Sequence, residues 1–276
     1  MTMSDAAADG RLGHDFRDRR LLHAVMSGRG LEFQRLEWLG DSVLDTLAVI
    51  KLARLDDWSS PSMAHFAAAR QRLVSDRGLA EASKRENLRE LVDWAASEHR
   101  LGDLVESAIG AAWLDGGWSA AGYVAEHLVL HTVPAANGSV PWIAYGPPRD
   151  ADRWESASGR SLADARLLSA AQQYGPGRRR LAYIGDAVVE ATAAISLYKA
   201  QPVSTEGVLS MLRHEVQSNR ALLARSLEHG LDVRALEPRA IDDEHAADIF
   251  QALIGAFAMD AGPAVAVEVA SRLLGL

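Results

Sequence analysis

The sequence predicts an all-α protein built from two copies of one helical unit. Three observations lead to this fold class. Apolar residues recur at the spacing of helix faces in the main segments of the first half. Two motifs of that half return in the second half at one shared offset of 145 residues. The length of 276 residues suits two domains of ordinary size, each able to bury its own core.

The composition is that of a soluble globular protein, with 48% hydrophobic and 24% charged residues. The absence of cysteine excludes disulfides, thiolate catalysis and zinc-cysteine sites. The N-terminus has no basic stretch followed by an apolar one, and no uninterrupted apolar run reaches membrane-spanning length. We therefore expect a cytoplasmic protein with no membrane partner. The net charge of −8 argues mildly against nucleic-acid binding without excluding it.

The first half contains six segments that we expect to be helical. In chain order they are residues 15–27, 34–50, 63–82, 88–94, 101–111 and 119–131. The second and fifth of these are apolar almost all round, which is typical of buried helices. Residues 58–62 contain a proline and three serines, so a turn should start the third helix there. Gly116 and Gly117 are typical of a helix C-terminus, so the fifth helix should stop before them.

A change of composition separates the two halves. Residues 132–160 contain four prolines among scattered polar residues, which indicates a linker. We therefore expect one domain over residues 1–131 and a second over residues 161–276. The second repeats the first: the matched segments are 35–41 with 180–186, 75–77 with 218–220, and 103–111 with 248–256. This pattern indicates an internal duplication of a helical unit.

Two pairs of carboxylates interrupt the two apolar helices. Glu37 and Asp41 are four residues apart and project from one face of the first. Asp103 and Glu106 are three residues apart in the second. Either pair alone is more often part of a solvated face than a site. Here, however, the surrounding helix is apolar, a buried carboxylate needs a partner, and Arg35 is badly placed to serve both members of the first pair.

Packing the two apolar helices together would gather four carboxylates, which repel one another unless divalent cations lie between them. Ligands that are all oxygen, without Cys or His, select a hard ion, Mg²⁺ or Mn²⁺. Such a site commonly activates a water and stabilises charge on a phosphodiester. The first half therefore carries the features of a metal-dependent hydrolase.

The same residues resemble a known family. Residues 36–42 (Leu-Glu-Trp-Leu-Gly-Asp-Ser) look like the signature of ribonuclease III, the double-stranded-RNA endonuclease. Residues 103–106, followed by 108–111 and 114–117, resemble the family's second metal motif. With the repeat, the resemblance covers nearly the whole chain except the linker. It implies two ribonuclease III-like helical domains that pair within the chain as a pseudo-dimer, and it leaves further homo-oligomerisation open.

The resemblance also implies roles for individual residues. The expected ligands of the catalytic Mg²⁺ (or Mn²⁺) are Glu37, Asp41, Asp103 and Glu106. Glu106 would matter most for the chemistry, and the products would carry 5′-phosphate and 3′-hydroxyl ends. Trp38 matches an aromatic that fills a socket on the partner domain in family dimers, although its spacing fits a core residue equally well.

The second half departs from the family pattern at two ligands. Ala182 stands where Glu37 stands, and Gln251 stands where Glu106 stands, while Asp186 and Asp248 remain. Because a hard cation depends on ligand charge, we expect this half to be an inactive partner. The remaining aspartates should hydrogen-bond helix ends or neighbouring donors.

Other features carry less weight. Asp76 replaces the family's usual asparagine, the family's Thr-His-x-Ser segment is not evident around residues 24–28, and the chain ends where a separate double-stranded-RNA-binding domain would follow. Asp45 is expected to be structural. The run Arg178–Arg180 could contact phosphates, but a run of three arginines is usually a solvated turn.

Three functions fit the sequence. The first is a Mg²⁺-dependent endoribonuclease that acts on structured or double-stranded RNA with one active centre per chain. The second is the same fold and metal site reused on a small or carrier-bound substrate, which the acidic balance and the missing RNA-binding domain favour. The third is a non-catalytic RNA-binding or assembly protein, against which the complete set of four acids argues.

Overall fold

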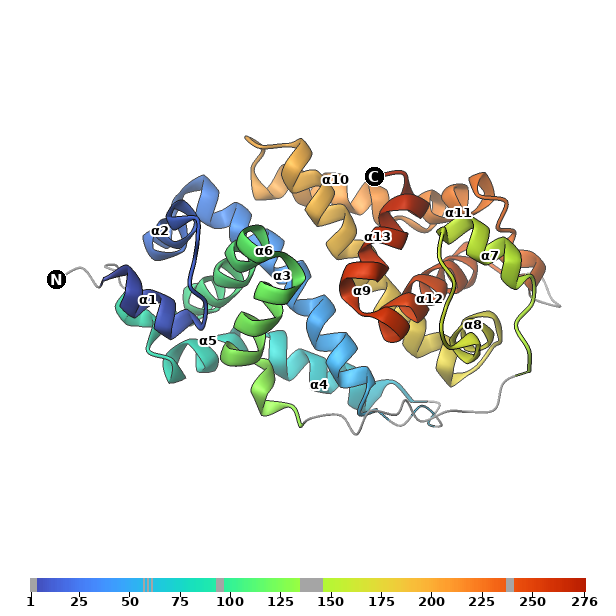
Figure 1. Ribbon diagram of the computed structural model, residues 1–276, viewed down its shortest axis with the longest axis horizontal. Helices are drawn as coiled ribbons and strands as arrows, with labels where there is room; N and C mark the ends of the chain where they lie inside the picture. Colours follow the sequence, from blue (N-terminus) through green and yellow to red (C-terminus); the bar gives the residue numbers. More distant parts are fainter. Residues whose placement is uncertain are drawn as a thin grey trace. The chain divides into compact units, whose positions relative to one another are not determined.

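The computed structural model describes residues 4–56, 58, 60, 62–92, 97–134, 146–236 and 241–276 (Figure 1). Within these ranges the chain forms thirteen α-helices and three short 3₁₀ helices and has no β-strand, so the predicted all-α class is confirmed. The chain forms two compact units. The first comprises Met1–Ala48, Ala67–Ala135 and Gln201–Val208; the second comprises Val49–Phe66, Ala136–Ala200 and Leu209–Leu276. Each unit thus includes a segment from the other half of the sequence, whereas the sequence predicted two consecutive domains.

Most helices of the first half of the chain overlap predicted segments, but α1 was not predicted and α6 spans two segments that were predicted as separate helices. In chain order they are α1 (Asp5–Leu12), α2 (Arg19–Ser27), α3 (Gly30–Ala53), α4 (Ala64–Val74), α5 (Asp76–Arg85), η1 (Leu88–Leu91), α6 (Glu98–Leu128) and η2 (Leu130–Thr132). The second half continues with α7 (Ala151–Ser158), α8 (Ala165–Gln172), α9 (Pro176–Ala200), α10 (Glu206–Gln217), α11 (Asn219–Glu228), η3 (Val233–Leu236), α12 (Asp243–Ala261) and α13 (Pro263–Leu274).

Serine caps account for one difference from the prediction. Residues 63–82 form two helices, α4 and α5, rather than one. Ser75 lies between them with an extended backbone, and its hydroxyl accepts a hydrogen bond from the backbone N–H of Gly78. The second repeat is built in the same way, because Ser218 caps α11 by accepting from Ala221.

Three further segments differ from the prediction. The helix expected near residues 88–94 is a short 3₁₀ helix over Leu88–Leu91, and residues 93–96 lie outside the described residues. The break expected at the paired glycines is a kink inside α6, where Gly117 has a φ of 67°. Helix α7 falls inside the predicted linker. It is helical because Trp154, only 4% exposed, packs into the second unit, and because Gly159 ends the helix in the left-handed conformation.

Glycines allow the central helices of each unit to cross at close range. A Cβ atom added to Gly40 on α3 would lie 1.8 Å from the carbonyl oxygen of Glu106 on α6. A Cβ added to Gly110 would lie 2.1 Å from the carbonyl oxygen of Leu36. Only glycine fits at such a crossing, which Figure 1 shows between the blue helix α3 and the green helix α6.

The second unit repeats this crossing between α9 and α12. A Cβ added to Gly185 would lie 1.8 Å from the carbonyl oxygen of Gln251, and one added to Gly255 would lie 2.0 Å from that of Leu181. All four glycines therefore occupy equivalent places in the two repeats. The duplication seen in the sequence is a duplication of this helix crossing.

The arginine run of the second half is not a solvated turn, contrary to the prediction. It lies in the first turns of α9, where the exposed fraction is 6% for Arg178 and 0% for Arg180. Arg180 forms an ion pair with Asp56 and donates to the carbonyl oxygen of Ser60 at 2.9 Å. Its counterpart Arg35 is 2% exposed in the first unit. These partners are far away in sequence, so local charge pattern could not reveal them.

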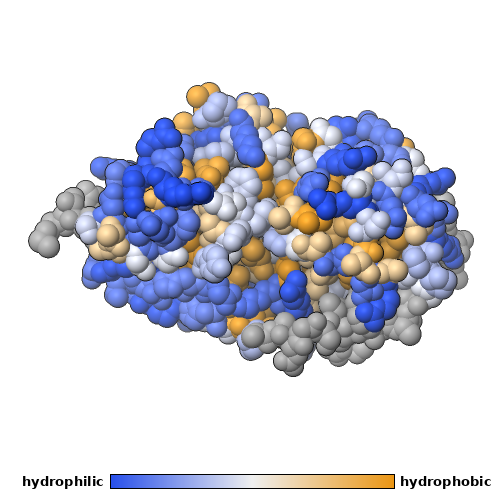
Figure 2. All heavy atoms as spheres, viewed as in Figure 1, coloured by the Kyte–Doolittle hydropathy of each residue, from blue (hydrophilic) through white to orange (hydrophobic). Residues whose placement is uncertain are grey.

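Two further features of the fold are the polar surface of the first helices and the apolar helix α9. Over α1, α2 and α5 the visible surface consists mainly of hydrophilic side chains, as expected for helices that bury one face (Figure 2). Among the described helices, α9 is the one long and apolar enough to cross a membrane, and 67% of its most apolar window is buried inside the protein. The core helix of a folded domain passes the same test, so this is weak evidence for a membrane span.

Candidate metal centre

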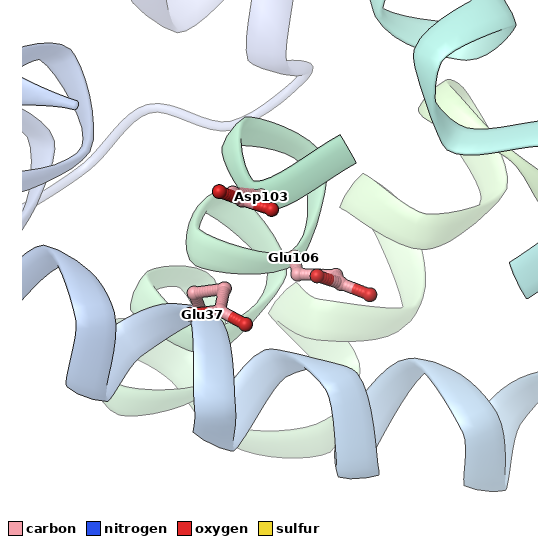
Figure 3. Close-up of side chains that lie close together, drawn as sticks. All are labelled: Glu37, Asp103 and Glu106. Atoms are coloured by element: carbon pink, nitrogen blue, oxygen red, sulfur yellow. The ribbon is translucent and has the colours of Figure 1, made fainter. Parts of the chain in front are cut away.

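The glycine crossing brings three of the four predicted ligands together. Glu37 extends from α3 towards α6, and Asp103 and Glu106 lie one turn apart on α6 (Figure 3). Each offers one carboxylate oxygen, and these oxygens all lie within 4.8 Å of one another. All three side chains are partly buried. The close approach at Gly40 places the backbone of Glu106 directly against α3, which explains why side chains from distant parts of the chain converge here.

Asp41, the fourth predicted ligand, is not part of this group of three. It lies one turn beyond Glu37 on α3 and is also partly buried. It is nevertheless near the cluster, because the charge of Asp41 is the strongest of the neighbouring charges that raise the pKa of Glu106. The structure therefore gathers three carboxylates tightly and keeps the fourth beside them.

Burial and crowding make these carboxyls hold their protons. Burial, followed by the charges of Glu206, Asp103 and Asp41, raises the pKa of Glu37 to about 8. Burial, followed by the charges of Asp41, Glu37, Asp103 and Asp76, raises the pKa of Glu106 well above its usual value. Converging oxygens that repel one another in this way fit a hard divalent cation, whose charge would offset the repulsion.

Asp103 has a more balanced environment. Burial raises its pKa, while the positive charges of His99 and Arg100 lower it. His99 Nδ1 lies 3.7 Å from an oxygen of Asp103 and 3.2 Å from an oxygen of Asp76. The His99 ring nitrogen therefore lies close to both Asp76 and Asp103.

A pocket of about 380 Å³ opens onto the cluster. Its charged and titratable lining residues are Arg29, Glu37, His99, Arg100, Asp103 and Glu206. Glu206 comes from the segment Gln201–Val208, and Arg35 positions that segment within the first unit by donating to the carbonyl oxygens of Gln201 at 2.6 Å and Ser204 at 3.0 Å.

Sequence analysis missed Glu206, and the duplication could not have revealed it. The positions 145 and 143 residues earlier hold Pro61 and Met63, so the repeat offers no second acid at this place. Asp45, by contrast, is structural as predicted: it is 6% exposed and forms an ion pair with Arg70. Trp38 is 3% exposed and is therefore a buried residue.

Comparison with known proteins identifies the family. A family model described as "Ribonuclease III domain" matches residues 34–117 and again residues 179–262, which together make up more than half of the chain. The chain belongs to the ribonuclease III family. The two matches coincide with the two glycine crossings, so both repeats are ribonuclease III domains.

Relatives agree with this family, and a solved structure has a similar fold. Ribonuclease 3 of Bordetella avium is 33% identical over 140 residues, and ribonuclease 3 of Sinorhizobium medicae is 32% identical over 133 residues. The alignments cover 45% and 44% of this chain and 53% and 55% of those relatives, so the chain matches only about half their length. The fold is similar to that of Dicer from Giardia, with a TM-score of 0.62 and 14% sequence identity over 88% of this chain and 54% of that one.

The second ribonuclease III domain has replaced the acidic cluster by a neutral contact. Gln251 donates a hydrogen bond from Nε2 to an oxygen of Asp186 at 2.8 Å. The prediction that Asp186 is held by a neighbouring donor is therefore confirmed. Asp248 is partly buried, and burial raises its pKa, while the charges of His245 and, to a smaller extent, Arg178 act to lower it.

Proposed function

We propose that the chain is a Mg²⁺-dependent endoribonuclease that hydrolyses phosphodiesters of structured or double-stranded RNA, with one active centre per chain. The observation that carries this proposal is the convergence of Glu37, Asp103 and Glu106 within 4.8 Å, in a family named for ribonuclease activity. The equivalent positions of the second domain hold Ala182 and Gln251 beside Asp248. We infer that the first domain acts and that the second is its inactive partner within the chain.

The proposed ligands are Glu37, Asp103 and Glu106, with Asp41 beside them. When bound there, Mg²⁺ or Mn²⁺ would supply the positive charge that offsets a phosphodiester and its developing transition state. The chain itself contributes three things: it fixes the carboxylates by the α3–α6 crossing, partly removes them from water, and leaves a pocket of about 380 Å³ in front of them. Without a cation, the acids of this pocket would repel an RNA phosphate.

A matched pair of substitutions tests the proposal. Asp103→Asn should reduce cleavage of a duplex RNA by at least about a hundredfold, because it removes a charged ligand. Asp248→Asn makes the same change at the equivalent place in the second domain and should leave the cleavage rate within about twofold of wild type. Both variants should keep the wild-type circular dichroism spectrum.

Glu106→Gln provides a second test, because it gives the first domain the residue that the second already has. We expect this variant to fold and to bind RNA but not to cut it. Cleavage at the wild-type rate by Asp103→Asn or Glu106→Gln would contradict the assignment of the site. Tight Mg²⁺ binding without any RNA binding or cleavage would instead favour a small or carrier-bound substrate.

A further inference from the structure

The second domain carries a pocket at the same place as the pocket of the metal centre. Its volume is about 240 Å³. Every residue that lines it stands 145 positions after a residue that lines the first pocket. Besides Gly175, these residues are Tyr174, Arg178, Arg179, Ala182, His245 and Asp248. We call this the arginine pocket. The duplication has kept the cavity while its side chains have changed.

The changes reverse the balance of charge. Three replacements make the arginine pocket more positive: Arg178 stands where Phe33 stands, Arg179 where Gln34 stands, and Ala182 where Glu37 stands. Two replacements each remove an arginine: Tyr174 stands where Arg29 stands, and His245 stands where Arg100 stands. In addition, Glu206 has no counterpart in the arginine pocket. Two arginines and three carboxylates therefore line the first pocket, whereas two arginines and one carboxylate line the arginine pocket. With every carboxyl ionised and the histidines neutral, the first pocket is net negative and the second net positive.

One tyrosine orients both guanidinium groups. Arg178 and Arg179 lie over the ring of Tyr174, with 5.7 and 5.6 Å between the guanidinium carbon and the ring centroid. Arg179 also donates to the Tyr174 hydroxyl at 2.9 Å, and Arg178 donates to the carbonyl oxygen of Gln172 at 2.8 Å. A guanidinium has five N–H donors in a planar fork that matches the oxygens of a phosphate. The pair is therefore held in position at the pocket rather than spread over the surface.

The other residues in and beside the arginine pocket no longer favour a cation. Gln251 has taken the place of a ligand and satisfies Asp186 by a hydrogen bond. Ala182 leaves space where the first domain has a carboxylate. His245 Nδ1 lies 2.7 Å from an oxygen of Asp242, and this hydrogen bond raises the pKa of His245. Asp248 is the one acid left in the lining.

We propose that the arginine pocket binds a phosphate group, so that the degenerate site of the second domain has changed from a cation site into an anion site. The phosphate belongs either to the backbone of the RNA or to a free phosphate compound, and the chemistry that recognises it is the same. The proposal does not depend on nuclease activity, because it concerns residues of the second domain and involves no covalent step.

The test uses the full chain in EDTA, so that no RNA is cleaved. Inorganic phosphate is titrated and followed by calorimetry and by NMR of the arginine Nε–Hε groups. Arg179→Gln gives the second domain the residue that Gln34 provides in the first, and it changes an exposed side chain. We expect it to weaken phosphate binding at least about tenfold, with Arg179→Lys intermediate, since lysine keeps the charge but loses the fork. The control Arg225→Gln removes an equal charge from α11, outside both pockets, and should have no effect.

Duplex RNA in a series of salt concentrations separates the two sources. If the RNA backbone supplies the phosphate, Arg179→Gln should lower the slope of log affinity against log salt by about one, whereas Arg225→Gln should not. If only free phosphate is bound, phosphate affinity falls and the RNA slope stays the same. Phosphate and RNA binding that are both unchanged by Arg179→Gln would overturn the proposal, as would Mn²⁺ binding at Asp248. Either result would leave the Asp103→Asn test of nuclease activity unaffected.

Discussion

Glu37 and Glu106 hold their protons at pH values where ordinary glutamates have lost them. The cause is burial together with the acids around them, so the site is in an electrostatically unfavourable state when it contains no cation. This property distinguishes a cluster of acids that is built to hold a metal from acids that share a solvated face. We therefore predict that the stability of the protein depends on both pH and Mg²⁺.

The pKa of Glu37 gives the direction of that dependence. The folded chain keeps this proton up to a pH of about 8, whereas the unfolded chain releases it near the model-peptide value of 4.5. Between those values the unfolded state binds fewer protons, so the free energy of unfolding of the metal-free protein should fall as the pH rises. Urea unfolding in EDTA at several pH values measures this fall, and Glu37→Gln should make it shallower.

Added Mg²⁺ should reverse the effect, because it binds the ionised carboxyls of the folded state. The rise in melting temperature caused by saturating Mg²⁺ should therefore be larger at pH 8.5 than at pH 6. An equal rise at both pH values, or an equal rise in a variant that lacks Glu37, would mean that Mg²⁺ acts elsewhere on the chain.

The site residues show what a sequence can and cannot reveal. Glu37, Asp103 and Glu106 could be found because each interrupts an apolar helix and each has a visible counterpart in the repeat. Glu206 could not, because neither matching position of the first repeat holds an acid. Its place beside the cluster depends on the hydrogen bonds of the buried Arg35 to the segment that carries Glu206. Long-range contacts of this kind leave no local pattern.

At the scale of helices, the α3–α6 crossing holds the ligands in place. We predict that Gly40→Ala destabilises the protein by at least about 2 kcal/mol, because its Cβ would overlap the Glu106 carbonyl and force the helices apart. Cleavage should fall with stability, since the separation of the helices sets the distance between Glu37 and Glu106. Chemical denaturation and single-turnover cleavage measure the two effects.

Gly122 provides the control for this substitution. It lies in the last part of α6, and a Cβ there would meet no atom within 4 Å. Gly122→Ala should be neutral or stabilise the protein by up to about 1 kcal/mol. Equal losses of stability from Gly40→Ala and Gly122→Ala would show that helix propensity, and not the close crossing, is what matters at Gly40.

Some helix boundaries could be predicted from the local sequence, and others could not. The paired glycines at 116 and 117 mark a break because their backbone freedom is a local property. The break at Ser75 was missed, since a serine cap between two helices looks like one more polar position in a continuous pattern. The buried Arg180 of α9 was misread because its partner Asp56 lies 124 residues away.

At the scale of the whole molecule, one complete centre and one degenerate site should give a characteristic product pattern. A duplex RNA with both strands labelled should first accumulate nicked molecules, because one visit cuts one strand. Native gels of an early time course measure this intermediate. Simultaneous cutting of both strands by a chain shown to be a monomer would contradict the proposal of a single active centre.

The central claim is that the first ribonuclease III domain binds divalent cations and the second does not. Anomalous scattering from crystals soaked in Mn²⁺ tests it directly. We predict a strong peak between Glu37, Asp103 and Glu106, and none beside Asp186 and Asp248. A peak of similar height in both domains, or in the second alone, would contradict the account.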